Sequence, residues 1–289
     1  MQTAPASNRA TSMPGIDTWP WGRILLWLVV GAIFAFLVAP SLLVVPMALT
    51  PLDILEFPPS GISLHSFADF FSSPAWLDAT LTSLKVALIA ISVSAVMGTL
   101  AAIALHRATF RGRSLVIGAI LLPIATPLVV LGLGYLNFFA RLHLVATPLG
   151  IGLAHAVLAL PYVYLVVASS LNGLNPALVR AARSLGGGPI AVFRHVYLPV
   201  ILPGLLGGML LAFTLSFDEV VIAYFLQGPD ATTLPVKIFI DLQYSLTPVI
   251  AAVSTLLLMF TTLLLAVQMV LMLRRSRISL LPGGMKVTE

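Results

Sequence analysis

The chain has no cysteine, and only 9% of its 289 residues are charged. The missing thiols exclude disulfides, thiolate metal sites and cysteine nucleophiles, and they leave the redox compartment undetermined. The histidines, at positions 65, 106, 143, 155 and 195, are scattered without metal-ligand spacing. The glycines at 186–188 are not followed by Gly-Lys-Ser/Thr, so they form no phosphate-binding loop. We therefore expect no enzyme activity, no metal site and no bound cofactor in this chain.

The chain is rich in long apolar runs, and 59% of its residues are hydrophobic. Runs of 18 or more apolar residues are typical of membrane spans. The sequence predicts an all-α membrane protein with six such spans. They cover Arg23–Leu49, Asp78–Leu105, Ser114–Phe139, Pro148–Leu171, Ile201–Phe225 and Thr247–Leu273. The spans form one domain at residues 23–273, between an N-terminal tail at 1–22 and a C-terminal tail at 274–289.

The basic residues predict the orientation of these spans. An even number of spans puts both termini on one side of the membrane. Most of the 15 Lys and Arg residues then share that side: Arg9, Arg23, Arg107, Arg111, Arg113, Arg180, Arg183, Arg194, Arg274, Arg275, Arg277 and Lys286. The opposite side holds acids: Asp53, Glu56, Asp69, Asp78, Asp230 and Asp241. Basic loops stay in the cytoplasm, so we expect both termini there. The membrane surface also accounts for the net charge of +5, without a nucleic acid.

The segment 175–199 is a polar, basic island between two apolar runs. Asn175 is a good helix cap, and Pro176 fits the first helical position, where its missing N–H costs nothing. This helix should end at Gly186. Pro189 should start a second short helix that stops before Pro199, because the residue before a proline avoids helical geometry. Such a projection is too polar for lipid and is suited to being gripped by another protein.

At these residues the chain resembles the membrane-spanning subunits of binding-protein-dependent ABC importers. Their cytoplasmic loop has Glu-Ala-Ala, three residues, Gly, nine residues, Ile, any residue and Leu-Pro. Val196 replaces the Ile here, and Arg180 replaces the Glu with the opposite charge. The resemblance, which covers roughly Arg23 to Leu273, implies that this coupling loop contacts an ATPase. The implied contact residues are Arg180, Ala181, Ala182, Arg183, Leu185, Gly186, Leu198 and Pro199.

The stretch Leu210–Phe239 is similar to the spermidine/putrescine type of these permeases. The resemblance implies a type I importer in a bacterial inner membrane, with a two-helix coupling loop between spans 4 and 5. It implies two ATPase subunits, which hold the ATP and Mg, and a second permease subunit, alike or different. It further implies an extracytoplasmic substrate-binding protein and transport by alternating access.

Asp218 and Glu219 are the sharpest polar signal within the spans. Charges at membrane depth are costly and mark a path or a partner. Adjacent helical residues point about 100° apart, so only one of them can face a narrow lumen. Phe217 and Tyr224 fall on a nearby face, and a carboxylate with aromatic rings suits an ammonium-bearing substrate. The alternative is that the pair reaches outward or caps a neighbouring helix.

Two further residues are candidates for the substrate path. Tyr135 lies in the third span, which Pro123 and Pro127 interrupt either at a path or at a simple packing kink. Asp241 lies near the outer surface.

The sequence favours a permease for a small cation such as a polyamine. Another amino compound, an aminophosphonate or an inorganic ion is the first alternative. A proton-driven secondary transporter using Asp218 or Glu219 is the second, and a purely structural membrane subunit is the third.

Overall fold

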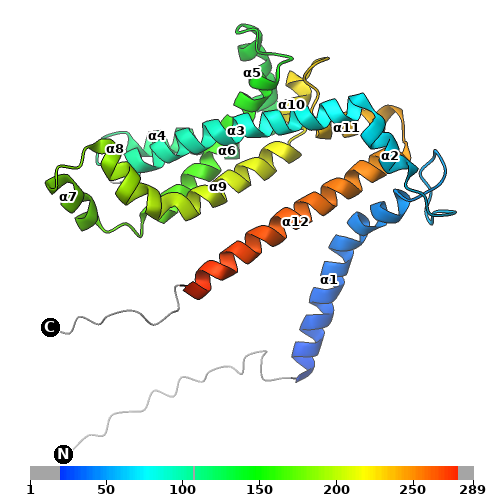
Figure 1. The fold of residues 1–289 in the computed structure, drawn as a ribbon, viewed down its shortest axis with the longest axis horizontal. Helices are drawn as coiled ribbons and strands as arrows, with labels where there is room; N and C mark the ends of the chain where they lie inside the picture. Colours follow the sequence, from blue (N-terminus) through cyan, green and yellow to red (C-terminus); the bar gives the residue numbers. More distant parts are fainter. Residues whose placement is uncertain (1–19, 107, 279–289) are drawn as a thin grey trace, which may run out of the picture.

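The computed structural model describes residues 20–106 and 108–278, and all the regular elements in these ranges are helices (Figure 1). The prediction of an all-α protein is confirmed for this part of the chain. The first half contains α1 (Pro20–Met47), α2 (His65–Ser72), α3 (Pro74–His106), α4 (Arg113–Ala125), α5 (Leu128–Ala140) and α6 (Pro148–Leu171). The second half contains α7 (Pro176–Ser184), α8 (Pro189–Val192), a π-helical turn η2 (Phe193–Tyr197), α9 (Leu198–Asp218), α10 (Val221–Leu226), α11 (Leu234–Tyr244) and α12 (Pro248–Ile278).

Prolines set several of the helix starts. Pro148 and Pro176 are the first residues of α6 and α7, where a missing N–H costs nothing. Thr147 caps α6, since its hydroxyl accepts a hydrogen bond from the N–H of Gly150 at 3.0 Å. The predicted cap of α7 is confirmed, because the Asn175 side chain accepts from the N–H of Ala177 at 2.9 Å.

Helices α3, α6 and α9 form the central layer and pack along much of their length (Figure 1). Small residues allow this close approach. A Cβ added to Gly98 of α3 would lie 3.0 Å from the side chain of Val163 on α6. One added to Gly204 of α9 would lie 2.0 Å from the hydroxyl of Ser170. Close backbone approach at these glycines therefore accompanies the packing of larger buried side chains, such as Tyr164, Leu171 and Ile201, in the same layer.

Side chains of the first half of α12 pack against α3, α9 and α11, but the ribbons of α1 and α12 diverge from the central layer (Figure 1). They meet near one end, where Ala48 packs against Ala251 and Ala252. Most of α1 is exposed. Its apolar surface requires lipid or another chain to cover it.

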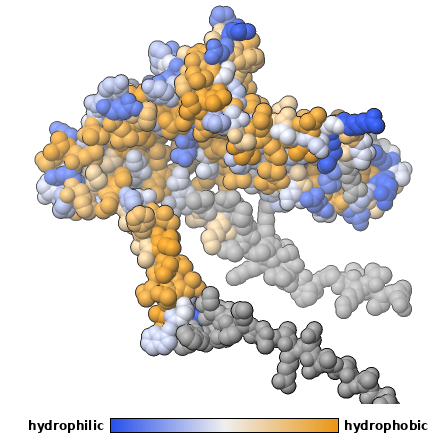
Figure 2. Space-filling view, turned by 180° about the vertical axis from the view of Figure 1, so that it is seen from behind, coloured by the Kyte–Doolittle hydropathy of each residue, from blue (hydrophilic) through white to orange (hydrophobic). Residues whose placement is uncertain are grey.

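Within the described residues, four helical stretches are long and apolar enough to cross a membrane. They are Trp21–Met47, Pro74–His106, Pro148–Leu171 and Pro189–Asp218. The pair α4 and α5 counts as a fifth if it is one broken span, and α12 contributes a shorter apolar stretch at Pro248–Leu264. The expected total of six stays a prediction. Figure 2 shows apolar side chains over most of the long body and hydrophilic ones gathered toward its ends.

The third span is interrupted at its prolines, as expected, but two other expectations about helix continuity were wrong. The third span is bent by 107° between α4 and α5, because Pro127 cannot donate to the helix and holds Thr126 extended. The fifth span ends at Asp218, and Glu219 is extended. The second helix of the 175–199 segment does not stop before Pro199. It continues through η2 into α9, and the wider π turn accommodates the absent N–H.

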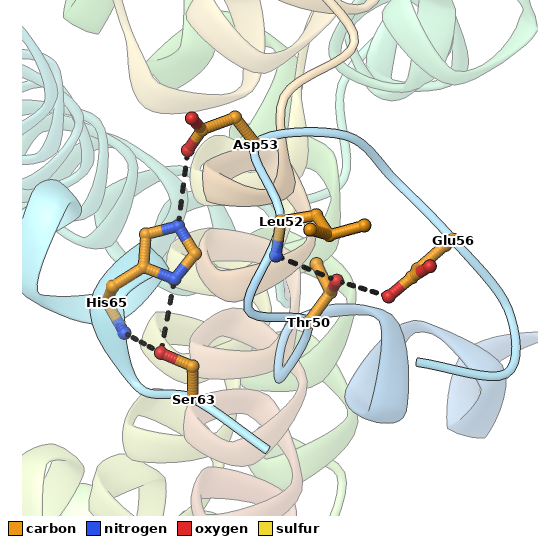
Figure 3. A network of polar contacts seen from close by, with 6 residues as sticks. All are labelled: Thr50, Leu52, Asp53, Glu56, Ser63 and His65. Carbon is orange, nitrogen blue, oxygen red and sulfur yellow. Dashed lines mark hydrogen bonds and ion pairs between the residues drawn. The ribbon is translucent and has the colours of Figure 1, made fainter. Parts of the chain in front are cut away.

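The loop between α1 and α2 is organised around a carboxylate and a hydroxyl (Figure 3). Glu56 accepts hydrogen bonds from the hydroxyl and N–H of Ser60, both at 2.6 Å, and from the hydroxyl of Thr50 at 2.8 Å. The Ser60 hydroxyl, then its N–H, then Thr50 lower the pKa of Glu56 below its ordinary value. His65 lies 3.5 Å from Asp53 and joins the start of α2 to the same loop.

Candidate functional site

The break between α9 and α10 separates the two adjacent acids. Asp218 is the last residue of α9, Glu219 has extended geometry (φ −77°, ψ 120°), and α10 starts at Val221. In a continuous helix the two side chains would diverge by about 100°. The break instead sends them into different environments, one open and one buried.

Glu219 is buried, with only 7% of its surface exposed. Its carboxylate accepts hydrogen bonds from the N–H groups of Ile222 at 2.9 Å and Ala223 at 3.0 Å. These N–H groups belong to the first turn of α10 and have no partner within the helix. Glu219 therefore caps α10, as the alternative interpretation of the sequence had it.

His155 of α6 completes a buried polar cluster around this cap. Its Nε2 lies 3.2 Å from Glu219 Oε2, at ion-pair distance but without the alignment of a hydrogen bond. Its Nδ1 lies 2.9 Å from the hydroxyl of Ser216 on α9. The cluster thus fastens α6 to both sides of the break. Sequence reasoning missed His155, because nothing local links it to residues more than 60 positions later.

Asp218 opens into a cavity of about 500 Å³ between α9, α11 and α12. It is the one charged residue among the described residues that line this cavity. No other described residue offers its carboxylate a hydrogen bond or an ion pair. We call this space the aspartate cavity.

Aromatic rings form much of the wall of the aspartate cavity. Phe213 and Phe217 of α9 stack with their centroids 5.3 Å apart. Phe260 of α12 lies 6.0 Å from the first ring and 5.8 Å from the second. Phe239 of α11 lines the cavity as well. An unpaired carboxylate beside aromatic faces can bind an ammonium group by ion pairing and cation–π attraction.

The remaining path candidates lie elsewhere. Tyr224 of α10 packs edge-to-face on Phe239 at 5.6 Å and so reaches only the rim of the aspartate cavity. Tyr135 of α5 stacks on Phe139 at 5.8 Å in the core between α5, α6 and α10. Asp241 of α11 faces a second cavity, where it pairs with Lys237. The structure brings only Asp218 and Phe217 of the predicted set together.

The 175–199 segment projects from the end of the central layer opposite α11 (Figure 1). Gly186 has φ +82°, as expected for a glycine that ends a helix. The N–H of Gly186 donates to the carbonyl of Arg183, and that of Gly187 donates to the carbonyl of Ala182. These two bonds close α7 and turn the chain sharply toward α8.

The surface of this projection is basic and partly apolar. Arg180 and Arg183 are exposed, and α7 has no buried residue. Leu185 is 89% exposed and Ile190 is 82% exposed. Ala181 and Pro199 are also exposed, and Ala182 and Leu198 are half-buried.

Comparison with known proteins identifies the family. The profile of the "Binding-protein-dependent transport system inner membrane component" family matches residues 20–278. The chain belongs to this family. It is an inner-membrane permease component of a binding-protein-dependent importer. The family match therefore favours an importer permease over the alternative of a secondary transporter.

Individual relatives agree with this assignment. The permease is 36% identical over 246 residues to the putrescine transport system permease protein PotI of Escherichia coli (strain K12), covering 83% of this chain and 86% of PotI. It is 29% identical to the spermidine/putrescine transport system permease protein PotC of Haemophilus influenzae, covering 79% and 89%. It is 31% identical to the putative 2-aminoethylphosphonate transport system permease protein PhnV of Salmonella typhimurium, covering 82% and 96%.

Solved structures support the fold. A chain of a bacterial ABC transporter that imports the acidic polysaccharide alginate matches with a TM-score of 0.71 and 14% identity, covering 89% of the permease and 98% of that chain. The alginate transporter in complex with a pentasaccharide-bound periplasmic protein matches with a TM-score of 0.64 and 15% identity, covering 86% and 94%. At this identity the likeness concerns the fold of the permease.

Proposed function

We propose that this permease carries a small organic cation of the polyamine class through a path that includes the aspartate cavity. Asp218 carries the proposal, because its carboxylate has no partner among the described residues and lies among aromatic rings in a helical membrane protein. A charge in such a setting is costly unless something of opposite charge visits it. The names of PotI and PotC point to the same substrate class.

The charge of the cavity separates this substrate from the nearest alternative. An aminophosphonate, the cargo in the name of PhnV, carries an anionic group as well as an ammonium. The described lining of the aspartate cavity has a carboxylate and no cation to receive that anion. A polyamine has only positive groups, so it fits the lining better.

The second part of the proposal concerns energy. We assign residues 175–199 as the coupling loop that contacts one of the two ATPase subunits of the complex, and we expect the permease itself to hydrolyse no ATP. The exposed Leu185 and Ile190 support this role, since apolar side chains at a polar tip are suited to burial in a partner. The loop continues through η2 into α9, so a push on the loop moves the helix that ends at Asp218.

The full assembly follows from the same proposal. A second permease subunit, alike or different, would cover the exposed apolar surface of α1. A binding protein would deliver the substrate at the end of the layer that holds α11. We retain six spans with both termini in the cytoplasm, and alternating access driven by the ATPases.

Uptake of radiolabelled putrescine into proteoliposomes tests the substrate assignment. The vesicles contain the permease with its partner subunits and binding protein, and ATP is supplied on the ATPase side. Asp218→Asn keeps the side chain's shape and should reduce uptake at least tenfold while the complex assembles normally. The matched control Asp69→Asn makes the same chemical change on α2, outside both cavities, and should leave uptake unchanged. Equal uptake by wild type and Asp218→Asn would remove the aspartate cavity from the path.

A further inference from the structure

A second cavity, of about 660 Å³, lies at the opposite end of the molecule from the coupling loop. It is formed by the first turns of α3, the 228–233 loop and α11. Three carboxylates line it, those of Asp78, Asp230 and Asp241, together with the ammonium groups of Lys85 and Lys237. We call it the outer cavity, after its place in the proposed orientation.

Lys237 is bound in this cavity in a distinctive way. Its Nζ lies 3.1 Å and 3.3 Å from the two carboxylate oxygens of Asp241. The same Nζ lies 4.5 Å from the centre of the Trp76 ring. A carboxylate and an indole face converging on one point form a binding site for an ammonium group, and Lys237 supplies that group from within the chain.

The walls of this site are held by packing and by a hydrogen bond between helices, whereas its occupant is carried on a long side chain. Trp76 is buried, with 6% of its surface exposed. The start of α11 is fixed to α3, because the N–H of Leu234 donates to the buried hydroxyl of Ser83 at 2.7 Å. Lys237 reaches the site on a flexible four-carbon stem. The site therefore persists when its occupant changes.

The other charged groups of the outer cavity have no partner within the part of the chain that the structure describes. Neither Asp78 nor Asp230 makes an ion pair or a side-chain hydrogen bond with another described residue, and the same holds for Lys85. The cavity thus holds one carboxylate more than it holds ammonium groups. A diammonium ligand can place one end between Trp76 and Asp241 and the other near a free carboxylate.

We propose that Trp76 and Asp241 form an entry site for the alkylammonium end of the substrate, and that Lys237 is a tethered stand-in that occupies it until substrate arrives. The proposal rests on the proposed function for its choice of substrate class. The incoming ammonium replaces the Lys237 ammonium on the same two partners, so one cation–π contact and one ion pair are exchanged for equal ones. The free carboxylates then favour the ligand with the second positive charge.

A purely structural role for the Lys237–Asp241 pair makes a different prediction. An i, i+4 ion pair on α11 that packs against an aromatic ring stabilises the helix, and removing it would only loosen the structure. The entry site predicts that removing the Lys237 ammonium strengthens ligand binding. Deleting the stand-in ammonium frees Trp76 and Asp241 for the ligand.

The test is calorimetric titration of putrescine into the importer complex in lipid nanodiscs, without nucleotide or binding protein. Lys237→Met keeps the length of the stem and should tighten putrescine binding about tenfold, equivalent to about 1.4 kcal/mol. Lys85→Met removes the same charge from the same cavity but not from the site, and should change affinity less than threefold. Adding Asp241→Asn to Lys237→Met should abolish the gain. Butane-1,4-diol, the uncharged analogue, should give no binding heat.

Two additions keep the result interpretable. Lys237→Gln, which can still donate a hydrogen bond to Asp241, is measured beside Lys237→Met, and both must elute as assembled complexes. The titrations are repeated with Asp218→Asn, which removes the charge of the aspartate cavity and should leave the Lys237 effect intact.

Unchanged affinity in both Lys237 variants would overturn the entry site, and so would an equal gain from Lys85→Met. Uptake of putrescine together with no Lys237 effect would refute the entry site and spare the proposed function. The expected gain in affinity in a complex that does not take up putrescine would refute the proposed function and support the site.

Discussion

Glu219 is expected to act on stability, and the size of its effect follows from its contacts. In Glu219→Gln one side-chain oxygen remains and can accept from one N–H of α10. The other oxygen becomes an NH₂ group that faces a second backbone donor and the ring of His155. The change loses a charge-assisted hydrogen bond, worth about 1.5–3 kcal/mol, and leaves a buried N–H unsatisfied at a cost of about 1–3 kcal/mol. Together these two effects amount to about 2.5–6 kcal/mol.

Thermal unfolding of the purified permease complex in nanodiscs measures this loss. We expect Glu219→Gln to lower the melting temperature by about 10 °C, at about 2–4 °C per kcal/mol for a chain of this size. Asp218→Asn is the control at the next residue, and it should stay within about 2 °C of wild type because Asp218 has no described partner. The double variant His155→Gln/Glu219→Gln should be less destabilised than the sum of its single variants. If Glu219→Gln has the same melting temperature as wild type, Glu219 does not stabilise α10 as its cap, and our explanation of the break between α9 and α10 is wrong.

Other predictions concern the coupling loop and the loop between α1 and α2. Gly186→Val should weaken pull-down of the ATPase, because φ +82° strains a β-branched residue, whereas Gly188→Val, in equally open space at φ −69°, should not; equal pull-down by both would contradict the role of the turn. Arg180→Glu restores the acid that the family resemblance implies, and it should keep or strengthen ATPase binding; severe loss would show that this ATPase carries a compensating acid. Glu56 has a lowered folded-state pKa, so its contribution to loop order is present above its ordinary pKa and is lost as pH falls through the lower folded value. Amide exchange at Ser60, corrected for intrinsic rates, should therefore rise at acid pH in wild type and already be raised at neutral pH in Glu56→Ala.

Much of the helical framework could be predicted from local sequence signals. Proline at a first turn and a side-chain cap act within a few residues, so the starts of α6 and α7 were readable. Gly186 ends α7 for an equally local reason.

The wrong predictions of helix boundaries share a physical cause, which is that tertiary packing can override the local sequence signal. Nothing between Leu215 and Leu226 is a helix breaker, yet the helix breaks at Glu219. The break is stabilised by the buried side chain of His155 on another helix and by the N–H groups that the break itself frees. Such compensation is invisible until α6 and α9 are brought together. Pro199 shows the opposite case, in which a local breaker is absorbed by a π turn within a continuing helix.

The different roles of Asp218, which faces the aspartate cavity, and Glu219, which caps α10, are therefore a consequence of the break between α9 and α10. Had the helix continued, both acids would have lain in the span, and neither would have found the free N–H groups that make burial tolerable. Ending α9 at Asp218 exposes the first N–H groups of α10, and Glu219 accepts hydrogen bonds from them while the His155 ring lies 3.2 Å from its carboxylate. Asp218 is thereby left at a helix end, beside Phe217 and without a partner in residues 20–106 and 108–278. One acid stabilises the geometry in which the other stays available, so neutralising Glu219 should reduce both stability and uptake, whereas neutralising Asp218 should reduce uptake alone.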